Sequence, residues 1–183
     1  MKYNYIRISG EKIDLCAFRS DEEAIEKYMK WMNNEDVAWR IGRGDLVTDI
    51  NSERNWVNKP IDGLFQHKFN IVTKTGELIG NCDINFKKYR QACLGICIGE
   101  SEYTSIGIGT EVIKLLIKFS FEELNAHRVY LNLIAENERA HRCYLKTGLR
   151  DCGYAHDIAF HKGKWLSSIQ MEILENDYFN TNK

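Results

Sequence analysis

The chain of 183 residues is 44% hydrophobic and 28% charged, with 13 glycines and one proline, which is typical of one folded domain with a sizeable core. Its formal net charge of −1 excludes a global electrostatic attraction to nucleic acid or to anionic membranes. The sequence has no apolar run of about 18 residues and no apolar block near Met1 that resembles a signal peptide. We therefore expect a cytoplasmic protein with neither a nucleic-acid nor a membrane partner.

The first third of the chain predicts two strands followed by helices. Apolar residues alternate or cluster over 4–9 and 12–18, on either side of a turn. Ser20 is then expected to cap a helix with acidic residues in its first turn. Residues 33–50 show no clean period and indicate a loop, and a further helix is expected over 51–59.

The rest of the chain predicts strands, a long crossover helix and a closing hairpin. The expected strands are 68–72, 78–86, 93–98, 128–134, 149–161 and 165–174, and the expected helices are 110–125 and 138–147. This order predicts a mixed α/β (α+β) fold in one domain spanning residues 1–175, followed by a short polar tail over 176–183. The six cysteines form no Cys-x-x-Cys pair, so we interpret them as small hydrophobic residues rather than as metal ligands.

Residues 103–110, Tyr-Thr-Ser-Ile-Gly-Ile-Gly-Thr, stand between a strand pattern and the start of the long helix. Two glycines one residue apart allow a tight turn, and the first helical turn adds free backbone amides at the positive end of the helix dipole. Such a junction is suited to binding phosphate, although the same residues also fit an ordinary turn.

A second constellation is Asn137-Glu138-Arg139-Ala140-His141-Arg142-Cys143-Tyr144. Asn137 is a plausible helix cap, and Ala140 and Tyr144 follow it along one face of two helical turns. A small alanine between a polar cap and a phenol leaves room for a thin ligand along the helix. The alternative interpretation is a cap, a filler alanine and a half-buried tyrosine.

Together these two segments resemble the GNAT superfamily of N-acetyltransferases, over about residues 3–174. The family signature is Gln or Arg, two residues, Gly, one residue, then Gly or Ala, and here Gly107 and Gly109 match while Thr104 departs from it. The stretches 124–131, 135–140 and 160–165 look like the branch that includes spermidine acetyltransferases and ribosomal-protein alanine acetyltransferases. The resemblance implies a mixed, mostly antiparallel sheet flanked by helices, with a splayed central strand pair.

The resemblance also implies acetyl-CoA as cosubstrate, with no metal. Tyr144 matches the family tyrosine that acts as general acid beside the thioester sulfur. The expected cofactor-binding residues are the strand residues Ile96, Cys97 and Ile98, the loop residues Ser105, Ile106, Gly107, Ile108, Gly109 and Thr110, and Asn137 and Ala140 on the following helix.

No motif identifies the general base. Glu100, just beyond the splayed strand, and Asp83, on the neighbouring strand, are the two candidates. Each is also a plain solvated carboxylate at a strand end in an alternative interpretation.

The expected activity is transfer of an acetyl group to a primary amine by direct attack in a ternary complex. The acceptor is expected to be a polyamine or a protein N-terminus, with an aminoglycoside or amino sugar as the alternative small molecule. A non-catalytic acyl-CoA-binding regulatory module of the same fold is the alternative function. A nucleotide-binding enzyme is less favoured because no Gly-Lys-Ser/Thr follows the loop. The sequence leaves the oligomeric state open, with a homo-oligomer as one alternative.

Overall fold

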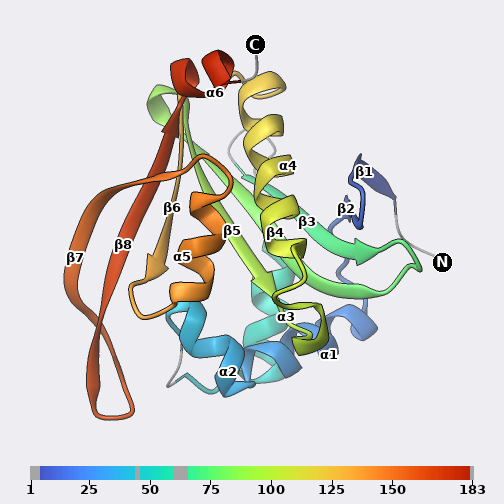
Figure 1. Ribbon diagram of the computed structural model, residues 1–183. Helices are drawn as coiled ribbons and strands as arrows, with labels where there is room; N and C mark the ends of the chain where they lie inside the picture. Colours follow the sequence, from blue (N-terminus) through green and yellow to red (C-terminus); the bar gives the residue numbers. More distant parts are fainter. Residues whose placement is uncertain (1–4, 44–45, 60–65, 182–183) are drawn as a thin grey trace.

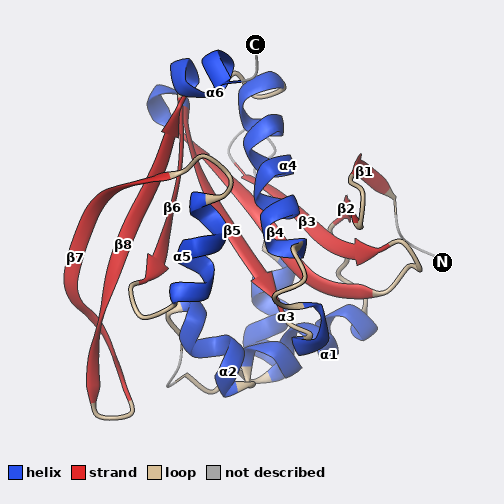
Figure 2. Ribbon diagram, in the orientation of Figure 1, coloured by secondary structure: helices blue, strands red, loops and turns tan. Residues whose placement is uncertain are grey.

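The computed structural model describes residues 5–43, 46–59 and 66–181 as one eight-stranded sheet with helices on both faces (Figures 1 and 2). The strands are β1 (Ile6–Ser9), β2 (Ile13–Ala17), β3 (Gln66–Thr73), β4 (Leu78–Lys87), β5 (Gln91–Ile98), β6 (Arg128–Ile134), β7 (Arg150–His161) and β8 (Lys164–Leu174). Their order is β1-β2-β3-β4-β5-β6-β8-β7. Each neighbouring pair is antiparallel except β5 and β6, which are parallel.

The helices are α1 (Glu22–Met32), α2 (Glu35–Ala38), α3 (Ile50–Asn58), α4 (Ile108–Glu122), α5 (Glu138–Leu145) and α6 (Glu175–Thr181). Short 3₁₀ turns are η1 (Trp39–Ile41), η2 (Lys88–Arg90) and η3 (Ser101–Tyr103). The expected mixed, mostly antiparallel sheet flanked by helices is confirmed. No helix in the described part of the chain has the length and apolar character needed to cross a membrane.

Two apolar clusters place the helices on opposite faces of the sheet. The larger cluster packs the apolar stripe of α4, including Val112, Ile113 and Leu116, on strand residues that are almost fully buried. The smaller cluster packs Tyr28 and Trp31 of α1 and Val57 of α3 on the other face. Figure 1 shows the same arrangement, with α4 and α5 in front of the sheet and α3 behind it. Each face therefore meets a different set of helices, which allows a separate pocket on each.

Several helix boundaries differ from the sequence expectations because nearby side chains compete to cap them. Asp21, rather than Ser20, caps α1 by accepting a hydrogen bond from the backbone of Ala24. Asp49 caps α3 in the same way, so that helix begins at Ile50. The segment 33–50, expected to be a loop, contains α2 and η1 in its described part.

The C-terminal segment also differs from the expected polar tail over 176–183. Its residues Glu175–Thr181 form α6, because the ring of Tyr178 stacks on that of Phe121 in α4 with centroids 4.7 Å apart. Residues 182–183 lie outside the described part of the chain.

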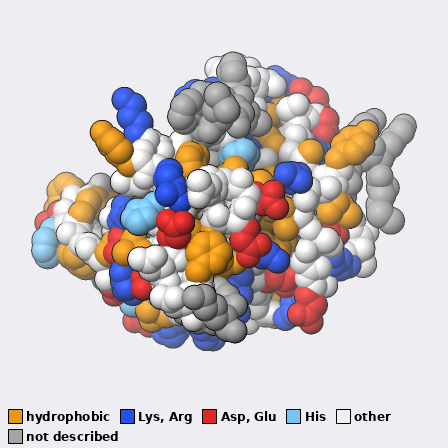
Figure 3. Space-filling model, turned by 90° about the horizontal axis from the view of Figure 1, so that it is seen from above, with side chains coloured by type: hydrophobic (Ala, Val, Ile, Leu, Met, Phe, Trp, Pro, Cys, Tyr) orange, Lys and Arg blue, Asp and Glu red, His pale blue; other side chains and the backbone are white. Residues whose placement is uncertain are grey.

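The surface carries acidic and basic side chains without a dominant sign. In Figure 3 lysine, arginine and acidic residues are interspersed over the visible face. This distribution agrees with the formal net charge of −1 and makes the local clustering of cations described below more informative.

Candidate active site

The site is built where β5 separates from β6. The two strands pair only over Gln91–Cys93 and Arg128–Tyr130, after which β5 continues alone on that side as far as Ile98. Its backbone N–H and C=O groups that face the gap therefore have no strand partner there. An extended ligand that carries amide groups can pair with them as another strand would.

A cavity of about 620 Å³ opens along this gap, between α5, the start of α4 and the α2–η1 segment. Most of the residues expected to bind a cofactor line it, namely Ile96, Cys97, Ile98, Ser105, Gly107, Gly109, Thr110, Asn137 and Ala140, together with Tyr144. Two expected residues do not. The side chain of Ile106 is 51% exposed to solvent, and Ile108 is buried in the main core under α4.

The loop before α4 presents its backbone to this cavity. Ser105 and Gly107 both have left-handed φ angles, 62° and 93°, and Gly107 forms the N-cap of α4 without a side-chain hydrogen bond. The first amides of a fifteen-residue helix are therefore uncapped by side chains beside the cavity. Serine tolerates the left-handed region less well than glycine, which makes position 105 a strained feature of the loop.

A lysine from a distant turn supports the loop from behind. Lys12, between β1 and β2, donates from Nζ to the carbonyl oxygen of Ile106 at 2.9 Å. Its backbone N–H also bonds Glu111 Oε1 in the first turn of α4, at 2.9 Å. Since Lys12 holds a loop carbonyl, it fixes the orientation of the adjacent peptide units. Sequence reasoning missed this residue, which is separated from its partner by 94 positions.

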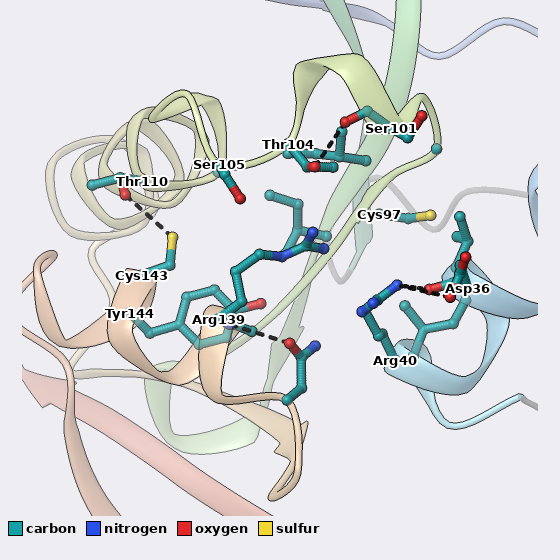
Figure 4. Close-up of a pocket in the computed structure, with 18 of the residues that line it drawn as sticks. Asp36, Arg40, Cys97, Ser101, Thr104, Ser105, Thr110, Arg139, Cys143 and Tyr144 are labelled. Atoms are coloured by element: carbon teal, nitrogen blue, oxygen red, sulfur yellow. Dashed lines mark hydrogen bonds and ion pairs between the residues drawn. The ribbon is translucent and has the colours of Figure 1, made fainter. Parts of the chain in front are cut away.

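Helix α5 supplies the other wall. Asn137 Oδ1 accepts from the backbone N–H of Ala140 at 3.2 Å and so caps the helix, while its Nδ2 is not used by that cap. Figure 4 shows the Tyr144 ring reaching the cavity from the same helix. Burial raises the pKa of Tyr144 well above its usual value. This phenol therefore stays protonated and acts as a hydrogen-bond donor.

Four cations line the cavity against a single acidic residue. Arg40 comes from η1, and Arg139, Arg142 and Lys146 come from α5 and its C-terminal end, while Asp36 is the acidic residue. The guanidinium group of Arg139 extends into the middle of the cavity (Figure 4). Burial and the nearby positive charge of Arg40 lower the pKa of Arg139. Arg40 pairs with Asp36, and Arg142 pairs with Glu138. The positive charge of Arg139 and Lys146, together with the uncapped amides and the free strand edge, fits a ligand that carries both phosphates and amides, as CoA does.

A second, smaller cavity of about 230 Å³ lies on the α1–α3 face of the sheet. Two residues, Ile41 and Cys97, line both cavities, so the two meet at β5. The second cavity is also lined by the rings of Phe18 and Trp56 and by charged residues, namely Arg43, Glu53, Lys68 and Asp83. Burial holds the pKa of the Cys97 thiol at about 12, so this thiol is neutral and a poor nucleophile at neutral pH.

The two candidate bases occupy different places. Asp83 lines the second cavity, and Asn85 Nδ2 donates to its Oδ2 at 2.6 Å. Burial raises the pKa of the Asp83 carboxyl above its ordinary value. Glu100 instead accepts a 3.0 Å hydrogen bond from Trp31 Nε1 and lies near the ammonium groups of two lysines of α1, and it lines neither cavity. The geometry therefore favours Asp83 over Glu100 as the candidate base.

Comparison with known proteins identifies the fold family. The model for the acetyltransferase (GNAT) domain matches residues 8–150. A spermidine N(1)-acetyltransferase of Vibrio cholerae serotype O1 is 25% identical over 171 residues, covering 81% of this chain and 98% of that protein. Two solved structures share the fold with TM-scores of 0.82 and 0.77. The first is a Vibrio cholerae spermidine N-acetyltransferase in complex with CoA and spermine, which is 22% identical and covers 92% of this chain and 99% of that one. The second is a Bacillus anthracis GNAT acetyltransferase, which is 23% identical and covers 92% of this chain and 98% of that one.

The match covers most of the chain and includes the splayed strand, the glycine loop and α5. The resemblance read from the sequence is confirmed. The chain belongs to the GNAT acetyltransferase family and is an N-acetyltransferase that uses acetyl-CoA as its cosubstrate.

Proposed function

We propose that this protein transfers the acetyl group of acetyl-CoA directly to a primary amine of a polyamine, with both substrates bound at once. The observation that carries the proposal is the meeting of the two cavities at Cys97, where β5 has already left β6. One cavity fits the cofactor and the other lies on the opposite face of the sheet, so the two substrates can approach from opposite sides. The spermidine acetyltransferases among the relatives support the polyamine class.

At the cofactor cavity, the free strand edge at Ile96 and Ile98 would pair with the two amides of the pantetheine arm. The loop amides of residues 105–110 and the positive end of α4 would bind the pyrophosphate. The cofactor supplies an activated thioester. Tyr144 would donate its phenolic proton in a hydrogen bond to the departing sulfur, stabilising the charge that develops there.

At the acceptor cavity, the amine must lose a proton before it can attack. An alkylammonium group with a pKa of ~10.4 is almost fully protonated at pH 7. Asp83 would accept that proton, and its lining of this cavity supports the role. A carboxylate whose pKa is raised by burial is also a better base than an exposed one.

Steady-state CoA release measured over polyamines, amino sugars, aminoglycosides and N-terminal peptides tests this proposal. We expect release that depends on the amine and is fastest with a polyamine such as spermidine. Acetyl-CoA binding without turnover across the whole panel would contradict catalysis and favour the regulatory-module alternative. Faster turnover of peptides or aminoglycosides would contradict the polyamine assignment.

A further inference from the structure

Glu53 is a buried acidic residue that the reaction described above does not use. It lies on α3, where its side chain is 2% exposed and lines the second cavity. No hydrogen bond or ion pair within the described part of the chain holds its carboxylate, and the charge that influences it is that of Arg43. Burial raises the pKa of this carboxyl. A carboxylate without a partner is costly to bury, so its place beside a cavity indicates a ligand.

Neither cation of the same cavity forms an ion pair with Glu53 within the described part of the chain, although the charge of Arg43 acts on it. Lys68 Nζ lies 4.7 Å from the ring centre of Trp56 and 5.5 Å from that of Phe18, and it donates to the Trp56 carbonyl oxygen at 3.3 Å. Arg43 Nη1 contacts the sulfur of Met32 at 3.8 Å. The Glu53 carboxylate thus remains available to a cation that enters the cavity.

The cavity offers two carboxylates on different elements. Asp83 lies on β4 in the sheet, and Glu53 lies on α3, a helix on this face of the sheet. A ligand with two amino groups on an aliphatic chain matches this arrangement, since one nitrogen can reach Asp83 while a second reaches Glu53. Phe18 and Trp56 also line this cavity, where Lys68 packs against both rings.

We propose that Glu53 binds the second, non-reacting ammonium group of the acceptor and thereby selects diamines and polyamines over monoamines. This inference rests on the proposed function and adds the residue that sets its acceptor class. The charged hydrogen bond forms inside a cavity, so it contributes more there than it would at the surface.

The test compares putrescine with n-butylamine, which share the reacting amine and the carbon chain but differ in the second ammonium group. In the wild-type protein we expect kcat/KM for putrescine to exceed that for butylamine by at least about tenfold. The nearly isosteric Glu53→Gln variant is expected to reduce this ratio at least about tenfold. Calorimetric titration of spermidine into the CoA-bound variant should show a matching loss of affinity.

Glu26→Gln is the matched control, because Glu26 is an exposed acid on α1 outside both cavities, and it should retain the wild-type ratio. Circular dichroism checks that Glu53→Gln folds, and Glu53→Asp, which keeps the charge on a shorter side chain, should also lower the ratio. An unchanged putrescine-to-butylamine ratio in a folded Glu53→Gln protein would overturn the inference while leaving acetyl transfer intact. A wild-type protein that acetylates no amine would instead overturn the proposed function itself.

Discussion

The carboxylate of Asp83 lies directly across the backbone of Gly95, its partner in the β4–β5 ladder. A Cβ atom at position 95 would overlap Asp83 Oδ1, so the carboxylate or the strand would have to shift. Gly95 is two residues beyond Cys93, the last residue of β5 that pairs with β6. The glycine that interrupts the strand pattern thus makes room for the candidate base at the point where the strand becomes free.

Gly95→Ala should therefore displace the Asp83 carboxylate. We expect kcat/KM for the amine to fall roughly 10- to 100-fold, since a displacement of about 1 Å at a reacting group has effects of this size. Affinity for acetyl-CoA, measured by calorimetry, should change much less. Gly153→Ala is the control, because a Cβ there would make only an ordinary 3.6 Å contact with Gln170. Full activity of Gly95→Ala would show that the position of Asp83 is irrelevant to catalysis.

Asp83→Asn should lower kcat by about 10²–10⁴ near neutral pH, because the amine then loses its proposed base. The defect should narrow as the pH approaches ~10, where the free amine becomes common. A pH–rate profile of both proteins checks this, and a pH-independent defect would argue against a role as base.

Asp83→Asn should raise the thermal stability of the protein at neutral pH, although it lowers the activity. The pKa of Asp83 is raised in the folded state, so the wild-type protein loses stability as the pH rises from the ordinary Asp value through the folded-state pKa. Asn carries no such penalty. Asp83→Asn should thus melt at a higher temperature than the wild type at pH 7, with the difference vanishing below about pH 4. A lower melting temperature at pH 7 would mean that the charged carboxylate stabilises the fold.

In the proposed mechanism, Tyr144→Phe removes one hydrogen bond to the departing sulfur while the ring stays in place. By analogy with the loss of one donor from an oxyanion site, we expect kcat to fall about 10²–10³-fold with little change in the KM for acetyl-CoA. Tyr154→Phe, at an exposed tyrosine on β7, is the matched control. A wild-type kcat in Tyr144→Phe would remove this residue from the mechanism.

Lys12→Met removes the ammonium group behind the loop. The lost hydrogen bond to the Ile106 carbonyl oxygen contributes about 1 kcal/mol of free energy. Its loss should raise the KM for acetyl-CoA about fivefold and leave kcat nearly unchanged. Lys12→Arg should restore much of the affinity, and Lys118→Met, on the exposed side of α4, should have no effect. A fall in kcat with an unchanged KM would contradict a role in orienting the loop.

The sequence predicts those parts of the site that lie within short segments. The cap at Asn137 and the spacing to Tyr144 follow from helix geometry, and the glycines before α4 follow from turn chemistry. Local signals of this kind also predict most strands and the order of elements, because the apolar period is a property of a few consecutive residues.

The parts that depend on distant contacts were not predictable. Lys12 reaches the loop before α4 from the β1–β2 turn, and Arg40 reaches the cofactor cavity from η1. No local pattern connects either residue with α4 or α5. Glu53 is indistinguishable in sequence from a solvated acid in a first helical turn, and only the tertiary fold buries it. Glu100 and Asp83 were equivalent candidates until the fold placed one beside α1 and the other in the cavity.

Initial-velocity measurements with acetyl-CoA and spermidine varied together test the central claim most directly. Direct attack between substrates bound in the two adjoining cavities predicts double-reciprocal lines that intersect, with no CoA released before the amine is added. Parallel lines with a burst of CoA in the absence of amine would indicate an acetylated enzyme, and they would contradict direct transfer between substrates bound together.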